Sequence, residues 1–168
     1  ASNDSNPLLF DPEQPEALTR IIDQSDKGLI VAEINSCAHI RRGTDGENRG
    51  EVDDGAIDEL DRQMKAIDER ARKCSIRIAL IHHHPVVLPG LIDPGEGYDA
   101  VANGNLLMGM LKRHAFHVVL HGHKHTPHSF TYDAVCAWRK DAVRPLFVIA
   151  GGSAGSTDLH GEASSITY

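Results

Sequence analysis

The sequence has few cysteines and no long apolar run. Its three cysteines, Cys37, Cys74 and Cys136, stand far apart in 168 residues. Their number and spacing exclude a disulfide framework and a C-x-x-C zinc site, and we expect reduced thiols in a cytoplasmic protein. No apolar run approaches the ~20 residues that a membrane-spanning helix needs. Because no secretory leader is recognised either, we expect no membrane partner.

Positive charge is also scarce. Lysine and arginine together number 17 against 24 aspartates and glutamates, so the net charge is -7. This balance excludes a broad nucleic-acid surface, although it remains compatible with a small local site. The 40% apolar and 24% charged residues are ordinary globular values, and the length suffices for one domain.

Short apolar runs alternate with amphipathic stretches along the chain. Apolar runs between turn residues predict strands, and apolar residues at helical spacing predict helices. The order favours an α/β layer with parallel central strands. We expect the run 75–81 to be a central strand covered on both faces. Residues 1–27 are expected to be an arm or linker, and 28–168 the domain portion. The expected strands are 28–35, 75–81, 116–120, an antiparallel strand within 128–139 and one entering the Gly/Ser turn after 150; the expected helices are 53–73, with Ile57, Leu60, Met64, Ile67 and Ala71 on one face, and 100–114, with Leu106, Leu107, Met110 and Leu111 inward.

Histidine is abundant in place of the scarce residues. Seven of the 11 histidines lie in "IALIHHHPVVLPG", residues 78–90, and "VVLHGHKHTPH", residues 118–128. Each cluster follows an expected parallel strand, and ligands gather at the carboxyl ends of such strands. Imidazole nitrogens bind zinc, manganese, iron or nickel. We therefore expect the two clusters to converge on one metal site, although a single loop histidine such as His82 or His84 is more often a solvated side chain.

The combination of "HHHP", "GHKH" and "FVIAGGSAG" resembles the calcineurin-like metallophosphoesterases, from about Gly28 to the end of the sequence. The resemblance implies the C-terminal half of a four-layer α/β/β/α sandwich, with a mixed sheet and flanking helices. By this match His83 is the metal ligand of H-x-P, and His123 and His125 are those of G-H-x-H; all three would act in catalysis through the metal. The family implies hydrolysis of phosphate monoesters or diesters, and the motifs look most like phosphodiesterases of the cyclic-nucleotide type.

The sequence departs from the family in one large respect. The D-x-H, G-D and G-N-H-D/E motifs that would precede "HHHP" are missing. An intact domain would hold two divalent ions (Mn, Fe, Zn or Ni), whereas this chain is expected to hold at most one and to be impaired alone. A missing N-terminal half or a self-association partner would complete it. Two alternatives stay open: a non-catalytic metal- or partner-binding half-domain, and a mononuclear zinc hydrolase of another class.

Four further residues are candidates for substrate binding. His84 lies within the first histidine cluster, and Asn35 follows the first expected strand, where a turn role is the competing interpretation. Gly152 and Ser153 end the last expected strand and can offer backbone N–H groups to an anion, although a plain tight turn fits them equally well.

Overall fold

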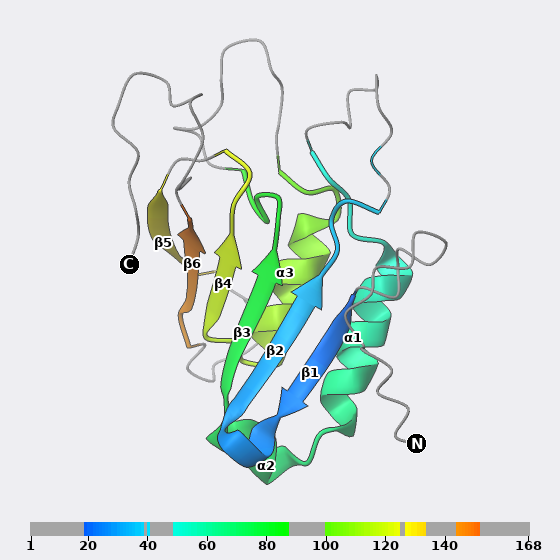
Figure 1. Ribbon diagram of the computed structural model, residues 1–168, viewed down its shortest axis with the longest axis vertical. Coiled ribbons are helices and arrows are strands. Elements are labelled where there is room, and N and C mark those ends of the chain that lie inside the picture. The colour runs from blue at the N-terminus through cyan, green and yellow to red at the C-terminus, as the bar shows by residue number, and fades with distance from the viewer. Residues whose placement is uncertain are drawn as a thin grey trace, which may run out of the picture.

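A six-stranded sheet with helices on one face forms the frame of the chain in this computed structural model (Figure 1). The structure describes residues 19–38, 40, 49–87, 100–124, 127–133 and 144–151. Its elements in chain order are β1 (Arg20–Gln24), the 3-10 turn η2 (Ser25–Lys27), β2 (Leu29–Ile34), α1 (Asp54–Ala66), α2 (Glu69–Cys74), β3 (Ile76–Ile81), α3 (Gly104–Arg113), β4 (Val118–His121), β5 (His128–Tyr132) and β6 (Leu146–Ala150).

The sheet is mixed, with the strand order β1-β2-β3-β4-β6-β5. Strands β2, β3, β4 and β6 pair in parallel, and the antiparallel strands β1 and β5 form the two edges. This confirms the α/β class, the parallel centre and the antiparallel strand after 128. The parallel strands all end at the same edge of the sheet, which is therefore where their following loops meet.

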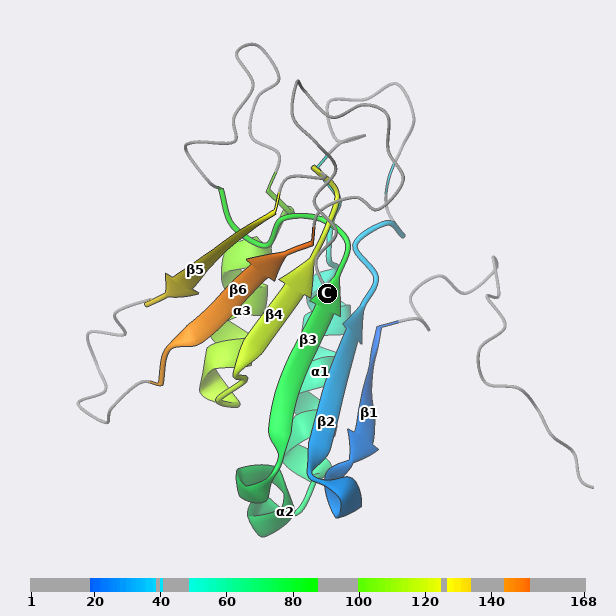
Figure 2. The ribbon, with the colours of Figure 1, turned by 60° about the vertical axis from the view of Figure 1, so that its left-hand side comes forward.

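Helices α1 and α3 pack against the same face of the sheet (Figure 2). The apolar side of α1 is buried through Ile57, Leu60 and Met64, as its spacing predicted. In α3 the expectation for Leu106 is wrong: this residue is 55% exposed, and Met108 is buried instead. The helix begins only at Gly104, so its buried side is set by Leu107, Met108, Met110 and Leu111.

The single helix expected over 53–73 is two helices. The backbone of Ile67 is extended, with ψ 136°. The carboxylate of Asp68 then accepts a hydrogen bond from the backbone N–H of Ala71 at 2.9 Å and starts α2. A capping aspartate inside an otherwise periodic stretch competes with helix continuation, and here the cap prevails.

The opposite face of the sheet is apolar and partly open to solvent. Its exposed large apolar residues alternate with buried ones along the strands, and they neighbour one another across β3, β4 and β6. The expectation that 75–81 is covered on both faces is therefore wrong. We call this surface the open sheet face; its residues and exposed fractions are Ile76 (57%), Leu80 (39%), Leu120 (37%), Phe147 (49%) and Ile149 (37%).

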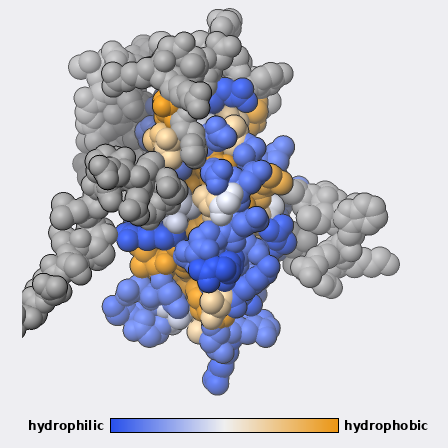
Figure 3. Space-filling view, turned by 90° about the vertical axis from the view of Figure 1, so that its right-hand side faces the viewer, coloured by the Kyte–Doolittle hydropathy of each residue, from blue (hydrophilic) through white to orange (hydrophobic). Residues whose placement is uncertain are grey.

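The edge formed by β1 and α1 is mostly hydrophilic (Figure 3). The strand β1 and the turn η2 lie within 1–27, the range expected to be an arm or linker, and sequence analysis did not anticipate them. Strand β1 pairs with all of Leu29–Glu33 of β2. Within the described part of the chain, no helix combines the length and apolar character needed to cross a membrane.

Candidate metal centre

Three histidines meet where β3 and β4 end. His82 and His83 follow β3 directly, and His123 lies two residues after β4. The N–H of Gly122 donates to the carbonyl of His82 at 3.0 Å and holds the two loops together. Each imidazole offers a nitrogen within 4.8 Å of the others, and the three form a group that could hold a metal ion. The sequence expectation that the two clusters converge is thus met for His83 and His123.

His83 is the most firmly positioned of the three. Its side chain is buried, and its Nδ1 is hydrogen-bonded to the hydroxyl of Ser36 at 2.8 Å. The same hydroxyl accepts the backbone N–H of His83 at 3.3 Å. Because Nδ1 has this partner, Nε2 remains as the nitrogen for a metal, which is the way second partners usually orient histidine ligands.

Gly50 leaves the space that the His83 ring occupies. Its φ is +66°, a conformation that glycine adopts readily, and a Cβ built there would lie 2.4 Å from His83 Nδ1. Ser36 is also joined to the residue after Gly50, since the N–H of Glu51 donates to the carbonyl of Ser36 at 3.0 Å. The loop before α1 therefore forms one wall of the site.

The environment keeps His83 neutral at physiological pH. Burial lowers its pKa to about 4, and the neighbouring rings of His123 and His82 add to this by disfavouring a further positive charge. A metal binds the neutral imidazole, so no proton has to be displaced from this ring at pH 7.

His123 has a backbone conformation that is unusual for a residue with a side chain. Its φ is +78°, whereas few residues other than glycine have a positive φ. Its Nδ1 lies 3.3 Å from Nε2 of His82. Unusual backbone conformations of this kind gather at functional sites, where the surrounding structure holds them in place.

A second group of rings adjoins the first. His84, His121 and His128 lie with ring centroids 4.7 to 5.7 Å apart, and His84 and His121 are buried. Burial lowers the pKa of His121 to about 4. The ring of His84 is 6.3 Å from that of His123. This substrate-binding candidate therefore lies near the metal group, by which we mean His82, His83 and His123, but it packs with His121 and His128.

The remaining candidates have a mixed outcome. Asn35 accepts the N–H of Cys37 through its side-chain oxygen at 2.9 Å, the turn role that competed with substrate binding. His125, Gly152 and Ser153 lie outside the described residues. Sequence reasoning gave no role to His82, because nothing in three consecutive histidines indicates which rings turn inward.

Comparisons with known proteins do not identify the family of this chain. A comparison with protein-family models gives no match, and a search of curated proteins also finds none. The case for this centre therefore depends on its geometry and on the motifs of the sequence.

The donor set fits a divalent transition metal. The group consists of three imidazoles and contains no carboxylate among the described residues. Nitrogen ligands of this kind suit zinc, manganese, iron and nickel, and three protein ligands leave a coordination position open in catalytic zinc sites.

Proposed function

We propose that this chain is the C-terminal half of a metal-dependent phosphoesterase. The observation that carries the proposal is the group of His82, His83 and His123, whose ligand nitrogens lie within 4.8 Å of one another at two adjacent strand ends. The order of "HHHP" and "GHKH" in the sequence supports it. The substrate would be a phosphodiester, such as a cyclic nucleotide, or else a phosphomonoester.

The three imidazoles would hold one divalent ion. When bound, such an ion supplies Lewis acidity toward a phosphoryl oxygen. Ser36 fixes the orientation of the His83 ring, and the bond from Gly122 to the carbonyl of His82 fixes the relative position of the two loops. These contacts pre-organise the ligands, which reduces the cost of ordering them when the ion binds.

The open sheet face supports the half-domain part of the proposal. Two sheets of a sandwich pack through their apolar faces, and the side chains of Leu80, Leu120 and Ile149 form such a face next to the metal group. A missing N-terminal half that contributes a second sheet would cover it and supply the carboxylates that the group lacks. A second copy of the chain is the other candidate for this partner.

A non-catalytic metal-binding half-domain is the second candidate function. The absence of a carboxylate from the histidine group, among the described residues, favours it. Three imidazoles bind an ion without the bridging ligand that a two-metal centre needs.

Metal binding and turnover can be measured separately on the 168-residue chain. We expect calorimetry to give one Mn²⁺ or Zn²⁺ per chain, and His83→Ala or His123→Ala to abolish binding. Ser36→Ala keeps all three imidazoles and is expected to weaken binding by about tenfold, because it removes only the orienting partner. The control is His114→Gln, since His114 lies beside Asp61 at the far end of the sheet.

Hydrolysis of bis-p-nitrophenyl phosphate then separates the functions. Weak metal-dependent turnover that the His83→Ala variant lacks supports the phosphoesterase. Stoichiometric binding with no turnover supports the metal-binding half-domain, and turnover of a carboxylic ester alone supports a mononuclear zinc hydrolase. If the wild-type chain binds no metal ion, the proposal is wrong.

A further inference from the structure

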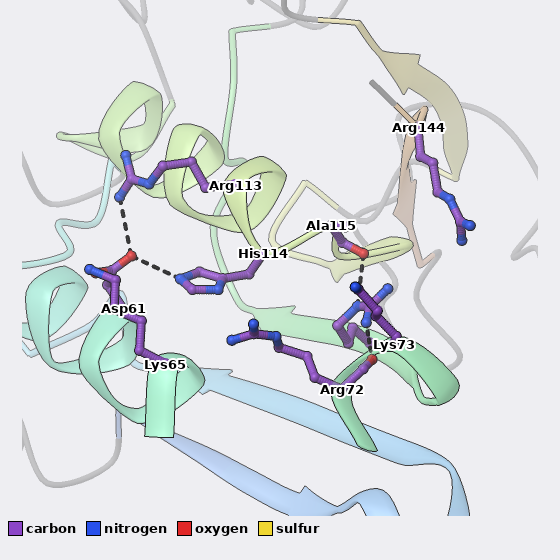
Figure 4. A pocket seen from close by; sticks show the side chains of 9 residues that line it. Asp61, Lys65, Arg72, Lys73, Arg113, His114, Ala115 and Arg144 are labelled. Carbon is purple, nitrogen blue, oxygen red and sulfur yellow. Dashed lines mark hydrogen bonds and ion pairs between the residues drawn. The ribbon is translucent and has the colours of Figure 1, made fainter. Parts of the chain in front are cut away.

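A cavity lies at the end of the sheet opposite the histidine group, where the parallel strands begin. It has a volume of about 640 Å³ and combines residues from α1, α2 and α3 with residues that precede β4 and β6 (Figure 4). Six of its lining residues carry a positive charge and one carries a negative charge. The charged residues of this basic pocket are Lys65, Arg72, Lys73, Arg77, Arg113, Arg144 and Asp61.

The negative charges near the pocket are already engaged. Asp61 forms ion pairs with Lys65 and with Arg113, and it lies 2.8 Å from the ring of His114. Lys73 pairs with Glu69, a residue outside the pocket lining.

Three arginines of the basic pocket have no such partner. Arg72, Arg77 and Arg144 form no ion pair with any carboxylate of the described part of the chain. With six cations and one carboxylate in its lining, the pocket carries a formal charge of +5 in a chain whose net charge is -7. A local excess of this size attracts anions even in an acidic protein.

Arg77 is the buried centre of this charge. It is only 4% exposed. Its Nε donates to the carbonyl of Ala115 at 2.8 Å, and another of its nitrogens donates to the carbonyl of Arg72. Burial lowers the pKa of Arg77, and the charges of Arg144 and Arg72 lower it further. Buried charges are normally paired, whereas here two carbonyls hold the guanidinium, His117 Nε2 lies 3.5 Å from one of its nitrogens, and the neighbouring charges of Arg72 and Arg144 are of the same sign.

The chemistry of the lining selects phosphate groups. Arginine presents a planar fork of donors that matches phosphate oxygens. Several arginines around one cavity match a ligand with several phosphates better than a single anion. Among the described residues, the lining contains no phenylalanine, tyrosine or tryptophan on which a base could stack. The volume of the pocket is within the roughly 300–1,000 Å³ typical of small-molecule sites.

We propose that the basic pocket binds a small oligophosphate, recognised through its phosphate groups and not through a base. The ligand class includes inorganic tripolyphosphate and the phosphate chain of a nucleoside triphosphate. The site is separate from the histidine group, because the two occupy opposite ends of β3. Its occupation does not depend on the metal centre or on phosphoester hydrolysis.

The test is binding of tripolyphosphate to the 168-residue chain in metal-free buffer, measured by calorimetry. We expect Arg144→Gln to weaken binding by about tenfold, and the double variant Arg72→Gln/Arg144→Gln to abolish it. Arg62→Gln is the matched control: Arg62 is an exposed arginine of α1, paired with Glu59 and outside the pocket lining. Circular dichroism verifies folding, and because Arg144 is exposed and makes no hydrogen bond within the described residues, its variant is expected to fold.

Three comparisons decide the outcome. ATP and GTP should bind about as well as tripolyphosphate, while adenosine should not bind. Equal losses in Arg62→Gln and Arg144→Gln would mean that tripolyphosphate binding responds only to the overall charge of the chain, and this would overturn the site. Binding of single-stranded DNA much tighter than tripolyphosphate would instead indicate a nucleic-acid surface and would also overturn the proposal, as would the absence of any tripolyphosphate binding.

Discussion

At the scale of single residues, the orientation of His83 depends on neighbours that lie outside the group of three histidines. Ser36 holds Nδ1 of His83, and Gly50 leaves room for its ring. Both come from the segment between β2 and α1, whereas His83 follows β3. The direction in which His83 points is therefore a property of two segments together.

Gly50→Ala tests this dependence. The new Cβ would lie 2.4 Å from His83 Nδ1, at a backbone φ of +66°. We expect a loss of about 1–3 kcal/mol in the free energy of unfolding, since both strain and displacement of the ring oppose the native structure. Metal affinity should also fall by about tenfold, because the ring loses its orienting hydrogen bond. Urea unfolding and calorimetry measure the two effects.

Gly109→Ala is the matched control. Gly109 lies inside α3, and a Cβ there would meet nothing within 4 Å. Alanine is the better helix former, so this variant should gain about 0.5–1 kcal/mol of stability with unchanged metal affinity. If both variants bind metal like the wild type, Gly50 does not position His83.

The sequence indicated the candidate metal ligands better than it indicated the residues that orient them. His83 and His123 could be selected because they match the H-x-P and G-H-x-H motifs of the family that the sequence resembles. The contact from Ser36 to His83 spans 47 positions, and no local pattern predicts a contact of that range. His82 was not selected because adjacent loop residues differ only in the direction that the folded loop gives them.

At the scale of elements, two neighbouring leucines of helix α3 differ sharply in burial. Leu107 is fully buried, whereas its neighbour Leu106 is 55% exposed. We expect Leu107→Ala to reduce the free energy of unfolding by about 2–5 kcal/mol through the lost apolar contacts and the cavity. Leu106→Ala should change it by no more than about 0.5 kcal/mol. Thermal and urea unfolding provide both values. Equal losses would contradict the burial of Leu107 and the exposure of Leu106.

The elements also show where periodicity fails as a guide. The strands of the parallel centre were predictable, because each is a short and mostly apolar run, and those of β3, β4 and β6 end at histidines or glycines. The break between α1 and α2 was not, since Ile67 and Ala71 fit the helical spacing while Asp68 caps a new helix. Strand β1 is short, and only its pairing with β2 distinguishes it from a polar arm.

At the scale of the whole molecule, the histidine group and the basic pocket lie at opposite ends of the sheet. Imidazoles gather at the carboxyl ends of the parallel strands, and cations gather at their amino ends. The open sheet face runs between them, because it includes Ile76 at the start of β3 and Leu80 near its end. The pocket itself is lined in part by α1 and α3, which pack against the opposite face, so a partner on the open sheet face would cover β3, β4 and β6 without closing the pocket.

Asp61 connects the two helices that cover the other face, and it makes stability depend on pH. From α1 it reaches Arg113 and His114 at the end of α3. The hydrogen bond from Lys65 and the contact with His114 lower its pKa from 3.8 to about 2 despite opposing burial. A lowered carboxyl pKa contributes stability above the unfolded value and loses it as pH falls through the folded one. The contribution is therefore complete above about pH 4 and disappears toward pH 2.

Asp61→Asn should consequently be less stable than the wild type by about 1 kcal/mol at pH 7, a value reduced because Lys65 and Arg113 are largely exposed. The difference should shrink below pH 4 and become small as the pH approaches 2, since the wild-type carboxyl of the folded protein is then partly protonated. Burial lowers the pKa of His114 and Asp61 partly offsets this, so the difference between the two proteins reports on the Asp61–His114 pair and not on Asp61 alone. Urea unfolding at pH 7, 4 and 2.5 measures it, with Asp58→Asn as the control because Asp58 is an exposed carboxyl of the same helix. A difference that stays constant with pH would show that Asp61 acts through packing and not through its charge.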